Sequence, residues 1–418
     1  MRVFFHEFAG HSFLLQLSRE LAQRDLVLRH AYSAELDTPQ GDMSPREDDP
    51  EGFSIHAVRV GGFHKKHQLL KRFAFERSYA RELIRQAEAF GPDVLVTAQA
   101  PSLVLSPLAN WAKARGVPWV NYVQDLYGYA AHRVLRKKLP VVGEAVGRYF
   151  LGLDKAAYRQ ADASIVITDD FRRMIGGWGV DDATIHTLPN WAPLEHLPQR
   201  SRENAWSAKQ GLAGESTDGV VRFVYSGTLS MKHNPALLLA LGEWLQESGA
   251  GVLLVSSQGA AVDWLRAQAE AKRLSTIRCL GFQPYPELPD VLGAADVLVA
   301  VLEPDASAFS VPSKVLSYFC AGRALLAAIP AENLAAKTIL QAGAGEVVEP
   351  SGAEAFVAAA KRLADSATAR QTAADSGRAY AEATFDIHRI GDGVESILRG
   401  VAGGAASASA EVASPKSA

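Results

Sequence analysis

The sequence predicts an α/β protein of two domains, each built on a parallel sheet that is covered by helices. Three observations support this fold class. The length of 418 residues exceeds that of one typical domain and suits two. Strand-like apolar runs alternate with helical patterns along the chain, as parallel sheets require. A proline-rich break, PNWAPLEHLP at residues 189–198, interrupts this alternation near the middle.

The composition is that of a globular protein. Apolar residues make up 48% of the chain and charged residues 21%, with a net charge of −3, which excludes a disordered chain. No run of eighteen apolar residues occurs, so we expect no transmembrane helix, and the start MRVFFHEF is too short an apolar run for a signal peptide. Cys279 and Cys320 lack disulfide or zinc spacing. We therefore expect a cytoplasmic protein that does not bind nucleic acid.

The first half of the chain alternates strands with helices. The helix at 13–24 carries Leu14, Leu17 and Leu21 on one stripe. Residues 35–51 are an acidic irregular loop, and a long helical region covers 66–90. The seven predicted strands are Arg2–Phe5, Leu26–Tyr32, Phe53–Val60, Asp93–Thr97, Trp119–Val123, Ala163–Thr168 and Thr184–Leu188.

The second half repeats this alternation. A helical stretch at 353–384 and a last helix to about Arg399 follow the strands, and the low-complexity residues 402–418 predict a disordered tail. We expect domains at 1–195 and 196–385, with the helix at about 386–400 packing back on the first domain. The six predicted strands are Val220–Ser226, Gly251–Ser257, Thr276–Gly281, Val297–Val301, Ala324–Ala328 and Glu346–Val348.

Two strand–loop–helix segments of the second half suit a diphosphate. In FVYSGTLSMKHNPA, Gly227 allows close approach to the backbone, and Lys232 adds a charge beside a helix start near residues 233–235. In VPSKVLSYFCAG, we expect Pro312 to fix the start of a helix, where Ser313 and Lys314 offer donors. Both segments follow strands of one sheet, so we predict that they converge on one site. An ordinary turn with an exposed lysine is the alternative for each.

Other candidate residues follow strands of the first domain. Asp125 comes after the fifth strand, and His11 follows Gly10 at a helix start, where it could also serve only as a helix cap. His6 and Glu7 could form an acid/base pair, but neighbours on a strand point to opposite sides.

No acidic pair in the sequence favours a metal site. Asp169 and Asp170 stand at a helix start, where acidic residues stabilise the helix dipole. No Asp-x-Asp motif occurs to hold a metal bound to a sugar nucleotide. We expect neither a metal nor another cofactor.

Basic residues gather in two stretches of the first domain. Such clusters attract phosphate groups, on anionic lipid or on a polyanionic ligand. A solvated helix face is the alternative explanation. The residues are Arg59, Lys65, Lys66, Lys71, Arg72, Arg77, Arg81 and Arg85 within 59–85, and Arg133, Arg136, Lys137 and Lys138 within 133–138.

The two segments around Gly227 and Lys314 resemble the donor half of family 4 retaining glycosyltransferases of the GT-B fold, in which two Rossmann-like domains face each other across a cleft. The resemblance is nearest to the branch that builds bacterial capsule, O-antigen and exopolysaccharide units, including N-acetylfucosamine transferases, and covers nearly all of residues 1–400. Further matching segments are Gly10-His11, 16–19 (QLSR), 124–127 (QDLY), 167–171 (ITDDF) and 189–193 (PNWAP).

The resemblance implies transfer of a hexosyl or N-acetylhexosaminyl group with retention. The donor is a nucleoside-diphosphate sugar, preferably a UDP-sugar, and the acceptor is a glycan or a polyprenyl-diphosphate-linked sugar. The enzyme would act in cell-surface polysaccharide biosynthesis, in the cytoplasm or peripherally on the inner membrane through the basic stretches. No metal is required.

The resemblance also implies roles for single residues. Gly227, Thr228 and Lys232 would hold the donor pyrophosphate together with Ser313 and Lys314. A separate set completes the site: Phe282 would meet the nucleobase, Gly10 and His11 would lie on the acceptor side, and Asp125 would lie near the reacting sugar. Asp125, Lys232 and Lys314 are the predicted catalytic residues.

The chain departs from the family pattern at two places. Thr228 stands where many relatives carry arginine, and Ser317 stands where the second glutamate of a paired motif would fall, with Glu303 at the wrong spacing for the first. Two alternatives therefore stay open, namely a nucleotide-sugar 2-epimerase of the same architecture and a catalytically silent subunit that only binds nucleotide sugar.

Overall fold

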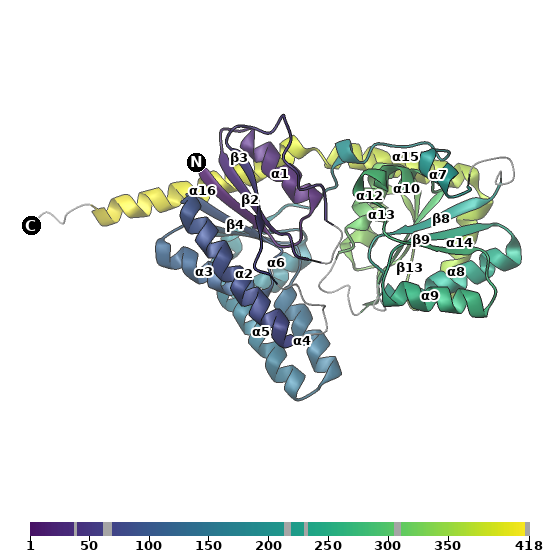
Figure 1. Ribbon diagram of the computed structural model, residues 1–418, viewed down its shortest axis with the longest axis horizontal. Coiled ribbons are helices and arrows are strands. Elements are labelled where there is room, and N and C mark those ends of the chain that lie inside the picture. The colour runs from purple at the N-terminus through teal and green to yellow at the C-terminus, as the bar shows by residue number, and fades with distance from the viewer. Residues whose placement is uncertain (37–39, 62–68, 213–218, 230–232, 305–310, 414–418) are drawn as a thin grey trace, which may run out of the picture. The chain divides into compact units, whose positions relative to one another are not determined.

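The computed structural model describes the chain except residues 37–39, 62–68, 213–218, 230–232, 305–310 and 414–418, and the side chains of 69–70 and 405–413 (Figure 1). The chain forms two compact units. Unit 1 comprises Met1–Pro189 and Ile387–Ala418, and unit 2 comprises Asn190–Asp386. The domain boundary therefore lies at Pro189, a few residues before the predicted one at 195.

Unit 1 contains a seven-stranded parallel sheet in the order β3-β2-β1-β4-β5-β6-β7. Its strands are β1 (Arg2–Glu7), β2 (Val27–Ser33), β3 (Phe53–Val58), β4 (Val94–Ala98), β5 (Trp119–Val123), β6 (Ala163–Val166) and β7 (Ile185–Thr187). Its helices are α1 (Ser12–Ala22), α2 (Leu69–Phe90), α3 (Ser102–Arg115), α4 (Tyr127–Lys138), α5 (Val142–Tyr158), α6 (Asp169–Gly176) and α16 (Ile387–Ala413).

Unit 2 contains a six-stranded parallel sheet in the order β10-β9-β8-β11-β12-β13. Its strands are β8 (Val221–Ser226), β9 (Gly251–Ser256), β10 (Ile277–Leu280), β11 (Val297–Val301), β12 (Ala324–Ala328) and β13 (Gly345–Val348). Its helices are α7 (Ala205–Lys209), α8 (Pro235–Ser248), α9 (Ala260–Ala271), α10 (Leu288–Gly293), α12 (Lys314–Ala321), α13 (Leu334–Ala342), α14 (Ala353–Asp365) and α15 (Ala367–Thr384).

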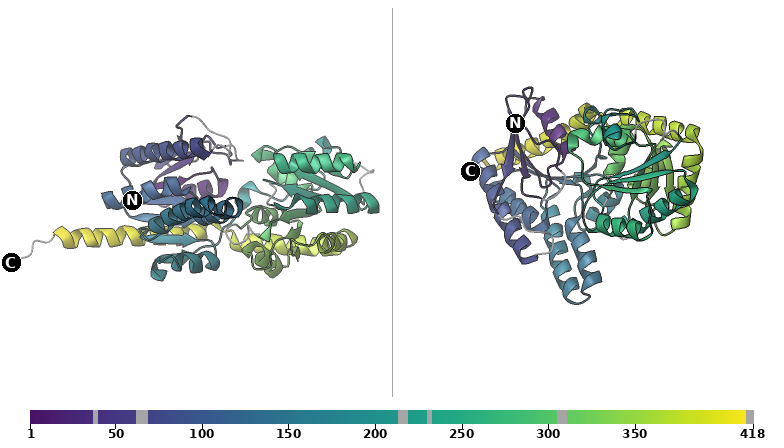
Figure 2. Two further views of the ribbon diagram at one scale, coloured as in Figure 1. Left: turned by 90° about the horizontal axis from the view of Figure 1, so that it is seen from below. Right: turned by 45° about the vertical axis from the view of Figure 1, so that its right-hand side comes forward.

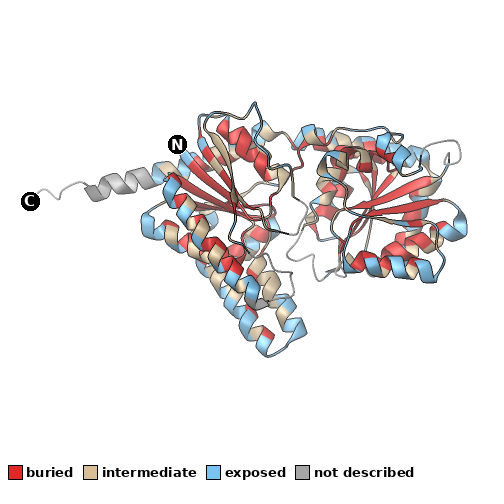
Figure 3. Cartoon of the chain, viewed as in Figure 1, coloured by how far each residue is buried: buried red, intermediate tan, exposed pale blue. Residues whose placement is uncertain are grey.

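Strands such as β11 and β12 are continuous apolar runs because helices cover both faces of each sheet (Figure 2). Every residue of β4, β11 and β12 is buried, and buried positions follow the strands of both units (Figure 3). Each of the thirteen predicted strands is present, with bounds that differ by at most two residues. The prediction of two parallel α/β domains is confirmed.

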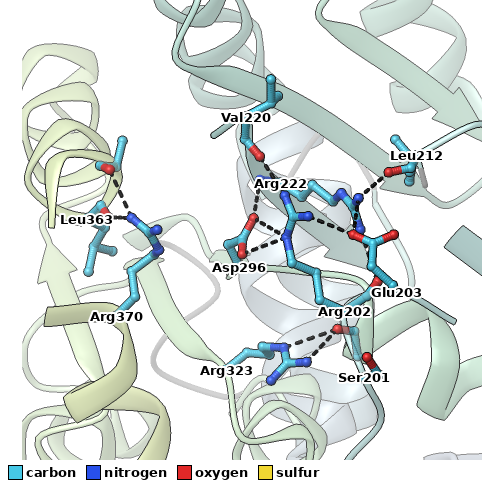
Figure 4. A network of polar contacts seen from close by, with 12 residues as sticks. Ser201, Arg202, Glu203, Leu212, Val220, Arg222, Asp296, Arg323, Leu363 and Arg370 are labelled. Atoms are coloured by element: carbon cyan, nitrogen blue, oxygen red, sulfur yellow. Dashed lines mark hydrogen bonds and ion pairs between the residues drawn. The ribbon is translucent and has the colours of Figure 1, made fainter. Parts of the chain in front are cut away.

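A charged network fastens residues 200–212 to the sheet of unit 2 (Figure 4). Arg222, at 1% exposure, donates to the Glu203 carboxylate at 2.7 Å and to the carbonyl of Leu212. Arg202 donates to Asp296 at 3.0 Å and to the carbonyl of Val220 at 2.7 Å. These bonds from Arg222 and Arg202 to carboxylates and backbone carbonyls fix the chain where it enters the first strand of unit 2.

The last helix, α16, returns to unit 1 and packs on α1. Arg24 donates to Asp392 at 2.5 Å, to Glu395 at 3.2 Å and to the carbonyl oxygen of His388 at 2.7 Å. The sequence predicts disorder from residue 402, but α16 continues to Ala413. Alanine has the highest helix propensity, and extending an existing helix avoids the cost of a new nucleus. None of the described helices is long and apolar enough to span a membrane.

Candidate functional site

Both sheets have the strand order of a doubly wound fold and therefore one reversal point each. In unit 1 the order reverses between β1 and β4, and in unit 2 between β8 and β11. Ligands of open parallel sheets bind beyond the carboxyl ends of the strands at such a point. The residues that follow β1, β4 and β5 in unit 1, and β8 and β11 in unit 2, are therefore the candidates for a site.

In unit 2, the chain turns sharply as it leaves β8. Gly227 has φ +103°, a conformation that L side chains rarely adopt, so glycine is required there. Its amide donates to the carbonyl of Ser256 on β9 at 3.1 Å, and Leu229 N donates to Ser257 Oγ at 3.0 Å. Hydrogen bonds to the end of β9 thus hold the turn in place, and Thr228 within the turn is exposed.

Lys314, the first residue of α12, reaches this turn. Its Nζ lies 3.4 Å from the carbonyl oxygen of Thr228, to which it donates, and 3.6 Å from the ring centroid of Tyr225. The Tyr225 hydroxyl donates to the same carbonyl at 2.7 Å. The structure therefore brings Gly227, Thr228 and Lys314 together, as the sequence predicts.

The ammonium group of Lys314 is poorly compensated. Burial lowers its pKa well below the usual range. Its neighbours are a carbonyl oxygen and an aromatic face, and no carboxylate pairs with it in the part of the chain that the structure describes. A bound anion would supply the missing negative charge, favour the protonated amine and raise the pKa of Lys314.

A tyrosine of α12 fixes the helix against the sheet. The hydroxyl of buried Tyr318 accepts from Ser226 N at 3.0 Å and lies within donating distance of the carbonyl oxygens of Ser226, at 3.1 Å, and Val299, at 3.2 Å. It thereby ties α12 to both β8 and β11 and sets the position of Lys314. This role of Tyr318 is not visible in the sequence, because an aromatic residue in an apolar helix gives no signal of a polar role.

The other predicted donor residues lie at the same edge or outside the described chain. Ser313 is exposed and occupies the N-cap position of α12, without a capping hydrogen bond from its side chain. The helix begins at Lys314, so the prediction that Pro312 is its first residue is wrong. Half-buried Phe282 follows β10, two strands from β8. Lys232 lies outside the described residues. Ser317 is half-buried within α12.

In unit 1, the turn after β1 is wrapped around one carboxylate. Glu7, fully buried, accepts from His11 N at 2.7 Å through Oε1 and from Ala9 N at 3.0 Å through Oε2. Gly10 has φ +81° and packs against Gln40, whose amide donates to the carbonyls of Ala9, at 3.1 Å, and Ser33, at 2.7 Å. The turn is therefore rigid and places His11 at the start of α1.

Glu7 also pairs with the His11 side chain, whose Nδ1 lies 3.2 Å from Oε2. Burial acts to raise the pKa of Glu7, but the hydrogen bond and charge of His11 outweigh it and lower that pKa. Burial acts to lower the pKa of His11, but Glu7 and, after it, the charge of Asp125 raise it. The pair therefore favours an imidazolium on a carboxylate, with 32% of the His11 side chain exposed.

Asp125, after β5, is held by a strained residue after β4. Gln99 Nε2 donates to Asp125 Oδ2 at 2.9 Å, and Gln99 has φ +52°. A non-glycine residue in this region costs roughly 1–2 kcal/mol and often marks a functional site. Half-buried Asp125 lies close enough to His11 to act on its pKa. The structure thus gathers Gly10, His11 and Asp125 with Gln99, which the sequence does not indicate, and with Glu7, which the sequence offers only as a possible partner of His6.

His6 and Glu7 do not form an acid/base pair. His6 Nε2 is 3.0 Å from the hydroxyl of Tyr79 on α2, whereas Glu7 contacts His11. Burial lowers the pKa of His6 to about 3, so His6 is a neutral core residue. No group of three or more histidine, cysteine, aspartate or glutamate side chains that could hold a metal occurs among the described residues.

The two sheets, with their sites at the reversal points, define a two-domain fold of the GT-B type. Residues 10–191 match the family model "Glycosyl transferase 4-like domain". No curated protein gives a significant match.

Solved structures match over almost the whole chain. Sucrose-phosphate synthase from Thermosynechococcus elongatus is 16% identical with a TM-score of 0.72 and covers 96% of this chain and 99% of its own. HepE from Anabaena, in complex with UDP and glucose, is 14% identical with a TM-score of 0.68, and the match covers 96% of this chain and 100% of HepE. WaaG, a glycosyltransferase involved in lipopolysaccharide biosynthesis, is 15% identical with a TM-score of 0.64, and the match covers 95% of this chain and 99% of WaaG. These likenesses show the GT-B fold, and with the domain match they support a GT-B glycosyltransferase.

Proposed function

We propose that the protein is a glycosyltransferase that takes a sugar from a nucleoside-diphosphate sugar. The observation that carries this proposal is the ammonium group of Lys314, which is partly desolvated and lies 3.4 Å from the Thr228 carbonyl at the carboxyl end of β8. A diphosphate bound between Gly227–Thr228 and the start of α12 would pair with this cation and with the exposed amides of the helix start. Lys232 would add a second cation.

A UDP-sugar is the preferred donor. Two similar structures carry UDP or UDP-glucose, according to their descriptions as HepE complexes, and a similar trehalose-6-phosphate enzyme from E. coli is bound with UDP-2-fluoro glucose. In this chain Phe282, at the end of β10, would meet the uracil base. The transferred group would be a hexosyl or N-acetylhexosaminyl unit.

The chemistry follows from the leaving group. The bond between the anomeric carbon and the donor phosphate oxygen breaks, an acceptor hydroxyl oxygen bonds to the same face of the anomeric carbon, and the hydroxyl proton passes to the departing diphosphate. Lys314, Lys232 and the helix dipole stabilise the charge that develops on that diphosphate. Asp125 stabilises the positive charge that develops on the sugar ring in the transition state. The anomeric configuration is retained.

The acceptor side of the proposal lies in unit 1. Gly10, His11 and Asp125 gather after β1 and β5, and an imidazolium at His11 can bind an acceptor phosphate or donate to a sugar hydroxyl. A glycan or a polyprenyl-diphosphate-linked sugar fits this chemistry. The resemblance to capsule and O-antigen transferases supports a role in cell-surface polysaccharide biosynthesis.

One observation favours a second candidate, a nucleotide-sugar 2-epimerase. Epimerisation needs an acid and a base that exchange protons with the sugar, and Glu7, His11 and Asp125 supply titratable groups in one place. A silent nucleotide-sugar-binding subunit is the third candidate.

The decisive experiment incubates the protein with UDP-, GDP- and ADP-sugars and analyses the products. Transfer to an added acceptor, or slow release of free sugar with UDP, supports the glycosyltransferase. A changed configuration at C2 with intact nucleotide sugar identifies the epimerase. Binding in a thermal-shift assay without any product would contradict both enzyme proposals.

A further inference from the structure

Helices α4 and α5 form a hairpin with an interface of its own. A Cβ on Gly147 would come within 2.6 Å of the Cα of His132, and one on Gly143 would overlap the carbonyl of Leu135, so glycine lets the helices touch. His132 Nε2 lies 2.9 Å from Glu144 across this interface. Both helices extend away from the sheet of unit 1 (Figures 1 and 2). The hairpin is therefore held by contacts along its inner side.

The outer end of this hairpin is apolar and exposed. Val141 is 83% exposed, Val142 63% and Leu139 57%. Exposed positions dominate this end of the hairpin in Figure 3. Six of the eight large apolar residues that are exposed in the described chain lie within this hairpin, namely Val134, Leu139, Val141, Val142, Val146 and Tyr149. Such a concentration marks an interaction surface.

Cations border this apolar end. Arg136, Lys137 and Lys138 form the last turn of α4, directly before Leu139 and all exposed. The chain as a whole carries a net charge of −3, so this positive end stands out from the rest of the molecule. Long basic side chains beside exposed aliphatic ones form the pattern of a segment that lies in a lipid interface.

An apolar groove continues this surface along the hairpin. Val142, Val146 and Tyr149 follow one another at the spacing of one helix face, and the last two line a groove of about 630 Å³ between α5 and α2. Phe150 and Phe73 also line the groove, with ring centroids 5.7 Å apart. Exposed Arg77 is a further lining residue. Volumes of this size, with an apolar lining and a few polar groups, hold small ligands.

We propose that the α4–α5 hairpin docks on an anionic phospholipid bilayer. Leu139, Val141 and Val142 insert among the lipid chains, and Arg136 and Lys138 contact the headgroup phosphates. The groove with Tyr149 and Phe73 takes one hydrocarbon chain of a lipid, with Arg77 next to its phosphate. This proposal does not rest on glycosyl transfer, because it uses none of the residues near Lys314 or His11.

The test is co-sedimentation of the full chain with vesicles of phosphatidylcholine alone and vesicles that also contain phosphatidylglycerol. We expect binding to the anionic vesicles only. The double change Val141→Asp and Val142→Asp should weaken it at least about tenfold, because two apolar side chains lose their burial in lipid. Leu340→Asp is the matched control, since Leu340 is a 56% exposed leucine of unit 2, and it should bind as the unchanged protein does.

Two further variants separate the parts of the surface. Arg136→Glu with Lys138→Glu should abolish the preference for phosphatidylglycerol, and Tyr149→Asp should weaken binding through the groove. All variants carry changes at exposed positions and should melt within a few degrees of the unchanged protein.

Three outcomes would overturn the proposal. The unchanged protein could fail to bind anionic vesicles, or Val141→Asp with Val142→Asp could bind them as well as Leu340→Asp does. The unchanged protein could also form a dimer without lipid that only the Val141 and Val142 change dissociates, which would make the hairpin an interface between two copies of the chain.

Discussion

The carboxyl ends of the two sheets share a topology and differ in charge. In unit 2 the edge presents an ammonium group, Lys314, beside backbone carbonyl and amide groups. In unit 1 the carboxylates of Glu7 and Asp125 lie near the imidazole of His11, and both raise the pKa of this histidine. The same strand order therefore carries a candidate anion site in one unit and a cluster of titratable side chains in the other. The loops after the strands, and not the sheets, set the chemistry.

The largest effect is expected at Lys314. Lys314→Ala should lower turnover at least tenfold and as much as roughly 10²–10³-fold, because it removes a charge that stabilises the leaving diphosphate. Without ligand, the melting temperature of Lys314→Ala should equal or exceed that of the unchanged protein, because the variant no longer buries an ammonium group. Lys232→Ala should also cost at least about tenfold. Lys337→Ala, at an exposed position, is the control. If Lys314→Ala were as active as Lys337→Ala, the cationic site would be refuted.

Glu7→Gln tests the contrasting carboxylate of unit 1. The change should lower the free energy of unfolding by about 1–3 kcal/mol, because buried donors lose part of their acceptor, and should lower the pKa of His11. That pKa is read from the imidazole resonances by NMR. The exposed Glu51→Gln should change neither quantity, and an unshifted His11 would show that Glu7 is only a structural residue.

The same pair predicts a pH dependence. Glu7, with its pKa lowered from 4.5, stabilises the fold above that value and loses the effect as pH falls through its folded pKa. His11, with its pKa raised from 6.5, stabilises the fold below that value and loses the effect as pH rises through its folded pKa. The difference in stability between the unchanged protein and Glu7→Gln should therefore be largest between pH 4.5 and 6.5.

Gly227→Ala asks whether the turn after β8 must be left-handed. The alanine should destabilise unit 2 by about 1–2 kcal/mol and weaken nucleotide binding, because φ +103° strains any Cβ. Chemical denaturation and UDP titration measure the two effects. Gly152→Ala, on α5 with open space around it, should be neutral or slightly stabilising, and identical behaviour of the two variants would contradict the strain argument.

The smallest effect is expected at Gln99. Gln99→Gly relieves the strain at φ +52° but frees Asp125, so the free energy of unfolding should change by less than about 1 kcal/mol while turnover falls. Asp25→Gly relieves a similar strain at φ +60° in an exposed turn. It should leave turnover unchanged, and a matching loss of turnover there would remove the role of Gln99.

The sequence predicts the strands and half of the site. Buried strands such as β11, VLVAV, are visible as apolar runs because both faces are covered. The sequence predicts Gly227 and Lys314 because a glycine directly after a strand and a lysine at a helix start both suit a bound diphosphate. The pairing of Glu7 with His11 was not predicted, because it depends on a turn at Gly10 that folds the chain back toward Glu7. The alternation of side chains along a strand does not reveal such a turn. The role of Tyr318 depends on its hydrogen bonds to the backbone of β8 and β11, and the exposed end of the α4–α5 hairpin depends on how the two helices pack, so neither is visible in the sequence pattern.

The return of α16 to unit 1 makes unit 2 an insertion. The chain leaves unit 1 at Pro189 and re-enters it at Ile387, so unit 2 is contiguous while unit 1 is assembled from two pieces. On a ribosome, residues 1–189 must wait for nearly two hundred further residues before Asp392 and Glu395 can reach Arg24. Unit 2 can thus complete its fold first, against the usual order in which the amino-terminal domain leads, and a nascent chain stopped at residue 386 should be more exposed to proteases in unit 1 than in unit 2.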